Sequence, residues 1–130
     1  SLLENAMRSE KQDVTSSIAY SVVDSANRLS LKAIVASTNS GYTAKKISRF
    51  RPKCPIIATS PNEDTVRSLA LYFGIYPKLV NEYLSTDEIV DSCKREAIQA
   101  LQLHAHDQII ITGGFPASLN NTNFMKIEEI

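Results

Sequence analysis

The sequence predicts an α/β fold in three layers, α/β/α, with helices on both faces of a mostly parallel sheet. Short apolar runs typical of strands alternate with helical patterns along most of the 130 residues. Such alternation places helices between the parallel strands of one sheet. Hydrophobic residues make up 43% and charged residues 22% of the chain, as in globular proteins. A chain of this length corresponds to one domain with its own core.

The first half of the domain is predicted to contain two helices and two strands in alternation. Asp13 can cap the first turn of a helix, and apolar residues follow it at helical spacing, at Val14, Ile18, Val22, Ala26 and Leu29. The apolar run 33–37 predicts a strand. The next helix ends at Arg51, because a proline disfavours helical geometry in the residue before it. The run 55–59 predicts a second buried strand.

The second half continues the alternation. A helix is predicted to begin after Pro61, because Glu63 and Asp64 are favourable in a first turn. It is predicted to end near Gly74. The third strand, 75–80, contains a proline and therefore suits an edge of the sheet. A long amphipathic helix from Thr86 carries its apolar residues at Ile89, Val90, Cys93, Ala97, Ala100 and Leu101. Two further strands are predicted at 108–112 and 124–130.

Residues 1–12 are predicted to be the end of a linker helix from a preceding domain. Leu2, Leu3, Ala6 and Met7 already follow helical spacing, and no initiator methionine stands before them. The sequence therefore looks like a segment of a longer protein, in which the domain itself spans 13–130.

Chemistry that suits a ligand is found in the loop between the first strand and its helix. The loop is rich in hydroxyl groups and contains a glycine; its residues are Thr38, Asn39, Ser40, Gly41, Tyr42 and Thr43. Hydroxyls and backbone amides are hydrogen-bond donors, and the start of a helix adds partial positive charge. The loop therefore favours an anion, above all a phosphate. Capping of the helix by the same hydroxyls, without a ligand, is the alternative.

A second loop, 113–123, leaves the same edge of the predicted sheet. Ligands of such sheets bind outside the carboxyl ends of the strands, so this loop is the second candidate for ligand contact. It contains no Lys or Arg, which weakens the case for a second phosphate.

Net charge and hydropathy exclude several function classes. The formal net charge is +0, which argues against nucleic acid or an anionic membrane as the main partner. The sequence has no run of about 18 apolar residues that could span a membrane. The basic residues of 45–53 are interpreted as a solvated helix face.

Metal and catalytic chemistry also lack the residues they need. His104 and His106 have no further ligands nearby, whereas zinc sites need three or four. Cys54 and Cys93 are interpreted as buried and unpaired, which fits a reduced, cytoplasmic setting. No phosphate-binding, nucleotide-binding or nucleophile motif of an enzyme is present, so the segment is predicted to be non-catalytic and to need no cofactor.

The motifs of the chain also occur in a characteristic order. They are Ala33-Ile34-Val35, Thr38-x-Ser40-Gly41-x-Thr43-Ala44, the runs 47–52 and 55–58, Arg67-x-Leu69-Ala70-Leu71-x-x-Gly74-Ile75-Tyr76-Pro77, 109–114 with Pro116, and Thr122-Asn123-x-Met125-Lys126-Ile127. In this combination the chain resembles the C-terminal, effector-binding domain of pyruvate kinase, from about residue 13 onward.

The resemblance implies a fold and a biological setting. This domain of the family has a mixed sheet of about five strands, with the last strand antiparallel. The full enzyme transfers phosphate from phosphoenolpyruvate to ADP with magnesium and potassium, at an active site in a barrel and a lid domain. The C-terminal domain contacts the barrel and contributes a subunit interface of the homotetramer. In many members it binds a sugar-phosphate effector, commonly fructose 1,6-bisphosphate.

The resemblance also implies roles for the two loops. In the family, the loop matching Thr38 to Thr43 surrounds a phosphate, and the loop matching 113–123 closes over the effector; here its candidate residues are Gly113, Gly114, Phe115, Pro116 and Ser118. This sequence has Asn39 where some members have Lys, and Tyr42 where some have Arg. The second loop lacks the Arg of several activator-sensing relatives.

Three alternatives to an effector-binding domain remain at this point. The first is a free-standing anion-binding module with this fold, the second is a structural interface domain without regulation, and the third is an independent small-molecule enzyme. The third is disfavoured by the absent catalytic motifs.

Overall fold

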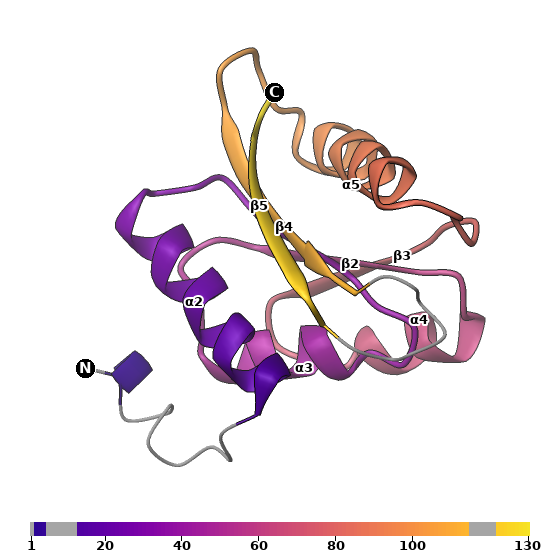
Figure 1. Cartoon of the computed structure of the whole chain (residues 1–130), viewed down its shortest axis with the longest axis horizontal. Helices are drawn as coiled ribbons and strands as arrows, with labels where there is room; N and C mark the ends of the chain where they lie inside the picture. Colours follow the sequence, from indigo (N-terminus) through magenta and orange to yellow (C-terminus); the bar gives the residue numbers. More distant parts are fainter. Residues whose placement is uncertain (1, 5–12, 115–121) are drawn as a thin grey trace.

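The computed structural model describes residues 2–4, 13–114 and 122–130, which form an α/β domain (Figure 1). Its five-stranded sheet has the order β3-β2-β1-β4-β5. The strands are β1 (Ile34–Ser37), β2 (Ile56–Ser60), β3 (Ile75–Leu79), β4 (Gln108–Gly113) and β5 (Phe124–Glu129). All neighbouring pairs are parallel except β4 and β5, which are antiparallel. The predicted mixed sheet with an antiparallel last strand is confirmed.

Helices cover both faces of the sheet, as predicted. They are α2 (Val14–Arg28), α3 (Tyr42–Arg49), α4 (Glu63–Leu69) and α5 (Thr86–Leu101). In Figure 1, α2, α3 and α4 lie on one side of the sheet and α5 lies on the other. The third layer is thus a single helix, which returns the chain from edge strand β3 to the central region of the sheet.

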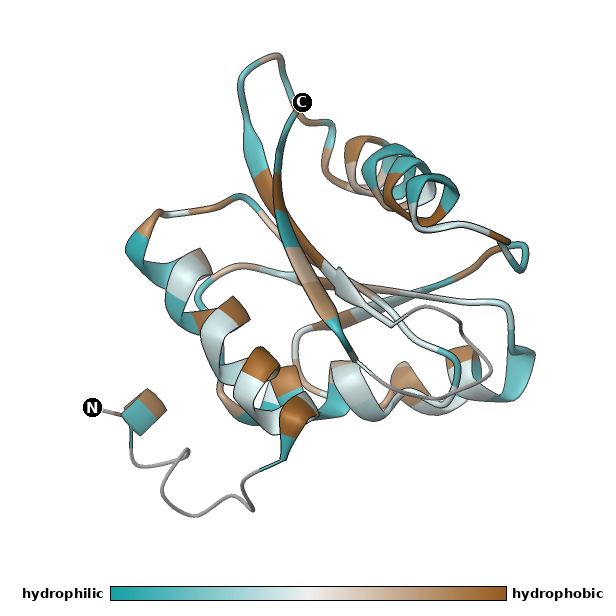
Figure 2. Cartoon of the chain, in the orientation of Figure 1, coloured by the Kyte–Doolittle hydropathy of each residue, from teal (hydrophilic) through white to brown (hydrophobic). Residues whose placement is uncertain are grey.

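Two apolar clusters, one on each face, form the core. Alternate residues of a strand point to opposite faces, so Ile34 and Ala36 join the cluster under α2, α3 and α4, while Val35 joins the cluster under α5. Figure 2 shows apolar colours along the strands and an alternation of apolar and polar colours along α5, as expected for a helix with one buried face.

The apolar faces predicted for α2 and α5 are wrong at the helix ends, where some of the predicted residues are exposed. Val14 and Leu29 are 67% and 55% exposed, because the buried stripe of α2 consists of Ala19, Val22, Val23 and Ala26 instead. Ala100 is exposed in the last turn of α5. Neighbouring residues of the same turns, Thr15 and Ser16 in α2 and Ala97 in α5, are buried, so the exposed side chains point away from the core.

Three of the helices begin with a residue whose side chain caps the first turn. Asp13 accepts a hydrogen bond from the Ser16 amide (2.7 Å), Asn62 caps α4 and Ser85 caps α5. The bond from the Ser16 amide is the main cause that lowers the pKa of Asp13 below its usual value. The predicted helix start at Asp13 is therefore confirmed, with a carboxylate that is held in its charged form.

The edge position of β3 is also confirmed. Its Pro77 pairs with Ala58 of β2 on one side, and no strand pairs with the other side among the described residues. A proline is tolerated there because an N–H at this position would point to solvent, so its absence removes no hydrogen bond to β2. Residues 2–4 are helical, while the rest of 1–12 lies outside the described residues, so the proposed boundary at residue 13 stays a prediction.

The two cysteines are free and differ in burial. Cys93 is fully buried in α5, and burial raises the pKa of its thiol to about 12. Cys54 is only half-buried, and the prediction that it is a core residue holds in part. Neither thiol is activated, since burial raises the pKa of Cys54 as well.

The chain offers a matched test of the core in two nearby leucines. Leu69 is fully buried at the end of α4, whereas Leu71 is 88% exposed. We expect Leu69→Ala to lower the free energy of unfolding by about 2–5 kcal/mol, because it leaves a cavity. Leu71→Ala should change it by less than about 0.5 kcal/mol. Urea unfolding measures both, and equal effects would contradict the packing described here.

Candidate functional site

The loop after β1 turns sharply into α3. Gly41 caps the helix in the left-handed region, with φ at +91°. Its amide donates to Thr38 Oγ1 (2.9 Å), and the Tyr42 amide donates to Ser40 Oγ at the long distance of 3.4 Å. A Cβ at residue 41 would lie 3.1 Å from Leu69 Cδ2. Both the turn and the packing therefore require glycine here.

Neighbouring elements fix the loop from outside. The Thr38 amide donates to the carbonyl of Thr59 in β2 (2.9 Å). The carbonyl of Asn39 accepts from Ser60 Oγ (3.3 Å) and from Thr65 Oγ1 (2.8 Å). The loop is thus attached to β2 and α4.

The second loop begins beside the first. Gly113 ends β4, and a Cβ there would lie 3.0 Å from the carbonyl oxygen of Ser37, so glycine allows the two strand ends to approach closely. At the far end of the loop, the buried hydroxyl of Thr122 hydrogen-bonds to that of Thr43 in α3. Of the predicted residues in this loop, Phe115, Pro116 and Ser118 lie outside the described residues.

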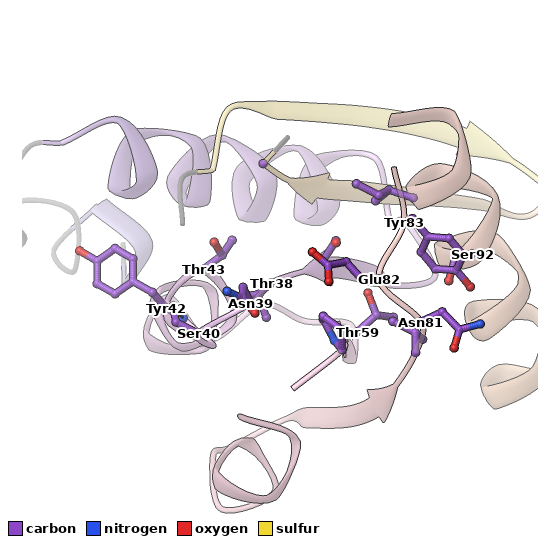
Figure 3. A pocket seen from close by; sticks show the side chains of 15 residues that line it. Thr38, Asn39, Ser40, Tyr42, Thr43, Thr59, Asn81, Glu82, Tyr83 and Ser92 are labelled. Carbon is purple, nitrogen blue, oxygen red and sulfur yellow. Dashed lines mark hydrogen bonds between the residues drawn. The ribbon is translucent and has the colours of Figure 1, made fainter. Parts of the chain in front are cut away.

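A pocket lies where these loops meet the carboxyl ends of the strands (Figure 3). Its cavity of about 40 Å³ has room for about three waters. Five residues of the first predicted loop line it, and so does Gly114 of the second. The first five are Thr38, Asn39, Ser40, Tyr42 and Thr43. Gly41 and Gly113 are not among the lining residues, and their roles are to shape the backbone.

The pocket also contains residues that sequence analysis missed. They come mainly from β2, from the connection between β3 and α5, and from α5, and they include Thr59, Asn81, Glu82, Tyr83 and Ser92. Figure 3 shows Thr38 and Asn39 on one side of the opening and Tyr83 and Ser92 on the other. The predicted loop is therefore one end of a longer site.

Buried hydroxyls form part of the pocket wall. Thr38, Thr59 and Ser92 are 8%, 2% and 3% exposed. Thr59 Oγ1 lies 3.9 Å from Cys93 Sγ, a weak contact. No hydrogen bond of the Ser92 hydroxyl is found within the described part of the chain, but its oxygen is not among the buried atoms that lack a partner; among the described residues that atom is Ser16 Oγ.

The charge in the pocket is unusual for an anion site. No Lys, Arg or His is found among the described lining residues, and Glu82 contributes a carboxylate. Positive potential comes from the first-turn amides of α3, which have no acceptors within their own helix. Lys46 is not among the lining residues: its Nζ lies 5.4 Å from the ring centre of Tyr42, and its charge helps to lower the pKa of Asp13.

The basic residues of 45–53 contact aromatic rings that are distant in sequence. Lys45 lies over Tyr72, and Arg51 lies over Phe73 at 4.4 Å from the ring centre. These pairs form because α3 packs beside the turn that follows α4. The interpretation of this segment as a solvated helix face therefore missed its aromatic contacts.

Metal binding and membrane insertion find no support in the described ranges. His106 Nδ1 lies 3.3 Å from Glu129 Oε2, and no group of three or more His, Cys, Asp or Glu in 2–4, 13–114 and 122–130 could hold a metal ion. None of the helices in these ranges is long and apolar enough to cross a bilayer.

Comparison with known proteins gives the family. The family model described as pyruvate kinase, alpha/beta domain, matches residues 16–128. The chain belongs to this family.

Curated pyruvate kinases match nearly the whole chain. Pyruvate kinase of Clostridium perfringens is 44% identical over 114 residues, which are 87% of this chain and 24% of that protein. Pyruvate kinase of Staphylococcus saprophyticus is 37% identical over 127 residues, 97% of this chain and 22% of that protein. Pyruvate kinase of Clostridium acetobutylicum is 30% identical over 122 residues, which are 93% of this chain and 26% of that protein. The chain therefore spans about a quarter of the length of these relatives.

Some of the missed pocket residues had a signal in the sequence. Thr59 lies near the carboxyl end of β2, and other missed residues follow β3; ligands of such sheets bind at that edge. Ser92 lies between Val90 and Cys93 on the apolar side of the α5 pattern, where a polar residue needs an explanation. The proximity of Glu82 to the first loop had no signal beyond its position after β3, because it depends on tertiary structure.

Two glycines with positive φ test the geometry of the loop. Gly41 has φ +91° and close neighbours, whereas Gly74 has φ +72° and no atom within 4 Å of the position that a Cβ would take. Alanine at either site costs about 1–2 kcal/mol from the backbone alone. We expect Gly41→Ala to destabilise the domain more than Gly74→Ala in urea unfolding, because it also crowds Leu69. A smaller effect at Gly41 would contradict the tight turn.

Proposed function

We propose that this chain is the regulatory and assembly domain of a pyruvate kinase, and that it binds a phosphorylated effector at the Thr38–Thr43 loop. Transfer of phosphate from phosphoenolpyruvate to ADP, with magnesium and potassium, takes place in other parts of that cytoplasmic enzyme. The observation that carries the proposal is the pocket at the carboxyl edge of the sheet, where hydroxyls and the start of α3 converge.

The chemistry of the loop supports a phosphate at this end. Thr38, Ser40 and Thr43 line the pocket with hydroxyls, and the amides of the first turn of α3 are donors. A hydrogen bond to a charged group contributes about 1.5–3 kcal/mol, and a helix terminus adds about 0.3–1 kcal/mol. After the cost of association, three or four such contacts correspond to micromolar to millimolar affinity.

The hydrogen bonds within the loop favour a second candidate, a structural interface domain without an effector. Thr38 Oγ1 and Ser40 Oγ already accept backbone amides of the turn. Each hydroxyl nevertheless keeps its own proton for an acceptor outside the loop. A binding measurement separates the two candidates, because only the regulatory domain responds to phosphate esters.

A ligand titration of the chain tests the effector site. We expect a sugar phosphate at millimolar concentration to raise its melting temperature. Ser40→Asp should abolish the rise, because it adds a negative charge to the phosphate end of the pocket. Gln99→Glu is the matched control: it adds the same charge on an exposed position of α5 and should keep the rise. No rise with any phosphorylated sugar would contradict the effector proposal and leave the family unchanged.

We also propose that the domain associates with the rest of the enzyme and with a second copy of itself. The described part of the sheet ends at β5, an edge strand that pairs only with β4. Its Met125 and Ile127 are 38% and 41% exposed. An edge strand with apolar side chains is a surface on which another chain can add.

Sedimentation over a range of concentrations tests self-association through this edge. We expect Ile127→Lys to shift the chain toward the monomer, because it places a charge on the apolar edge. Leu84→Lys, at a residue that is 81% exposed before α5, should leave the distribution as it is. A chain that stays monomeric at every concentration speaks against pairing of the isolated domain.

A further inference from the structure

We propose that the turn after α4, residues 71–73, is a docking surface for the rest of the enzyme, and that its partner there is an apolar face bordered by carboxylates. This inference rests on the proposed function, because it names a surface through which the domain associates with the rest of a pyruvate kinase. None of the three residues lines the pocket at the carboxyl edge of the sheet.

Three consecutive large apolar side chains are exposed in this turn. Leu71, Tyr72 and Phe73 are 88%, 42% and 65% exposed. The sequence of 68–77 contains no charged residue that would solvate them. Contiguous apolar groups on a protein surface mark interaction sites, and aromatic side chains are enriched where partners bind most strongly. The turn therefore has the composition of an interface centre.

Helix α3 holds the turn in place. The hydroxyl of Ser48, which is 3% exposed, donates to the carbonyl of Phe73 (2.7 Å). The guanidinium of Arg51 lies over the ring of Phe73, and Lys45 Nζ lies 5.2 Å from the ring centre of Tyr72. The turn is thus attached to α3 through its backbone and through both rings.

Positive charge borders the turn and indicates the chemistry of the partner. The sequence between Asp24 and Glu63 contains no Asp or Glu, although Lys45 and Arg51 lie within it. Arg51 is exposed, and among the described residues its guanidinium donates to the carbonyl of Ser48 (3.1 Å). A guanidinium has five N–H donors and matches the geometry of a carboxylate. An apolar partner face with carboxylates at its border therefore complements this surface.

The part of the enzyme outside this chain is the partner that these observations favour. The chain spans about a quarter of the length of its curated relatives, so most of such a protein lies outside it. Leu3, near the start of the chain, packs against the same apolar cluster as Leu69 at the end of α4. The chain therefore enters the domain on the face of the sheet that carries the turn. Figure 1 shows the N-terminus on the same side as α2 and α3.

Two other partners fit the surface less well. Pairing of two copies about a twofold axis through the turn would bring Lys45 and Arg51 of both copies together, and like charges disfavour such an interface. Nucleic acid is disfavoured by the formal net charge of +0.

Hydroxyl-radical footprinting of this chain and of the full-length enzyme that contains it tests the docking. We expect Tyr72 and Phe73 to be oxidised at least about fivefold more slowly in the full-length enzyme, as for side chains at the buried centre of an interface. Leu84, which is 81% exposed before α5, is the control and should be oxidised equally in both.

The same measurement separates this inference from the proposed association. Equal oxidation of the turn in both proteins, with slower oxidation elsewhere on the domain of the full-length enzyme, would overturn the inference alone. Equal oxidation at every exposed residue, Met125 and Ile127 of the β5 edge included, would overturn the proposed association as well.

A pair of charge variants in the full-length enzyme tests the chemistry of the partner. We expect Leu71→Glu to speed the oxidation of Phe73 at least about threefold, because carboxylates of the partner repel the new charge. Leu71→Lys changes the same exposed side chain and should have a smaller effect, since its ammonium group can pair with those carboxylates. Leu84→Glu should leave Phe73 as it is, and circular dichroism checks that each variant is folded. An effect of Leu71→Lys equal to or larger than that of Leu71→Glu would overturn the inference of an acidic border.

Discussion

The central position of β1 is the constraint on which the site depends. β1 pairs with β2 on one side and with β4 on the other, both in parallel. The chain therefore moves outward from β1 through α3 and α4, and returns through α5 on the opposite face. At this reversal the connections leave the sheet in opposite directions, and a crevice opens at the carboxyl ends of the strands. The loops after β1 and β4 border that crevice because of the strand order alone.

Local contacts then determine the shape of the crevice. The absence of a side chain at Gly113 lets β4 approach Ser37, and Gly41 allows the chain to turn into α3 beneath Leu69. The hydroxyl contact between Thr43 and Thr122 joins the start of α3 to the segment that enters β5. These contacts fix the start of α3 beside the pocket.

Much of the fold could be predicted from the sequence, because its signals are local. The buried strands β1, β2 and β4 are short apolar runs, and Asp13, Asn62 and Ser85 are side chains that cap helices in a recognisable pattern. The ends of helix faces were less predictable: Val14 is exposed, whereas the polar residues Thr15 and Ser16 beside it are buried in the same turn.

The candidate site was predictable only in part, for a physical reason. The Thr38–Thr43 loop is contiguous, so its donors could be recognised together. Glu82, Thr59 and Ser92 reach the same pocket from three other segments, and nothing in their local sequence places a carboxylate opposite that loop. The same holds for Lys45 and Tyr72, whose contact depends on the packing of α3 beside the turn after α4.

We propose above all that an anion binds at the start of α3. Membership of the pyruvate kinase family and the shape of the pocket both support this proposal. Nuclear magnetic resonance of the backbone amides during a titration with inorganic phosphate tests it most directly. We expect saturable shifts that are largest for the amides of Ser40 to Ala44, with those of the remote β5 edge unchanged. Shifts that are absent at these amides, or confined to exposed lysines elsewhere, would contradict it.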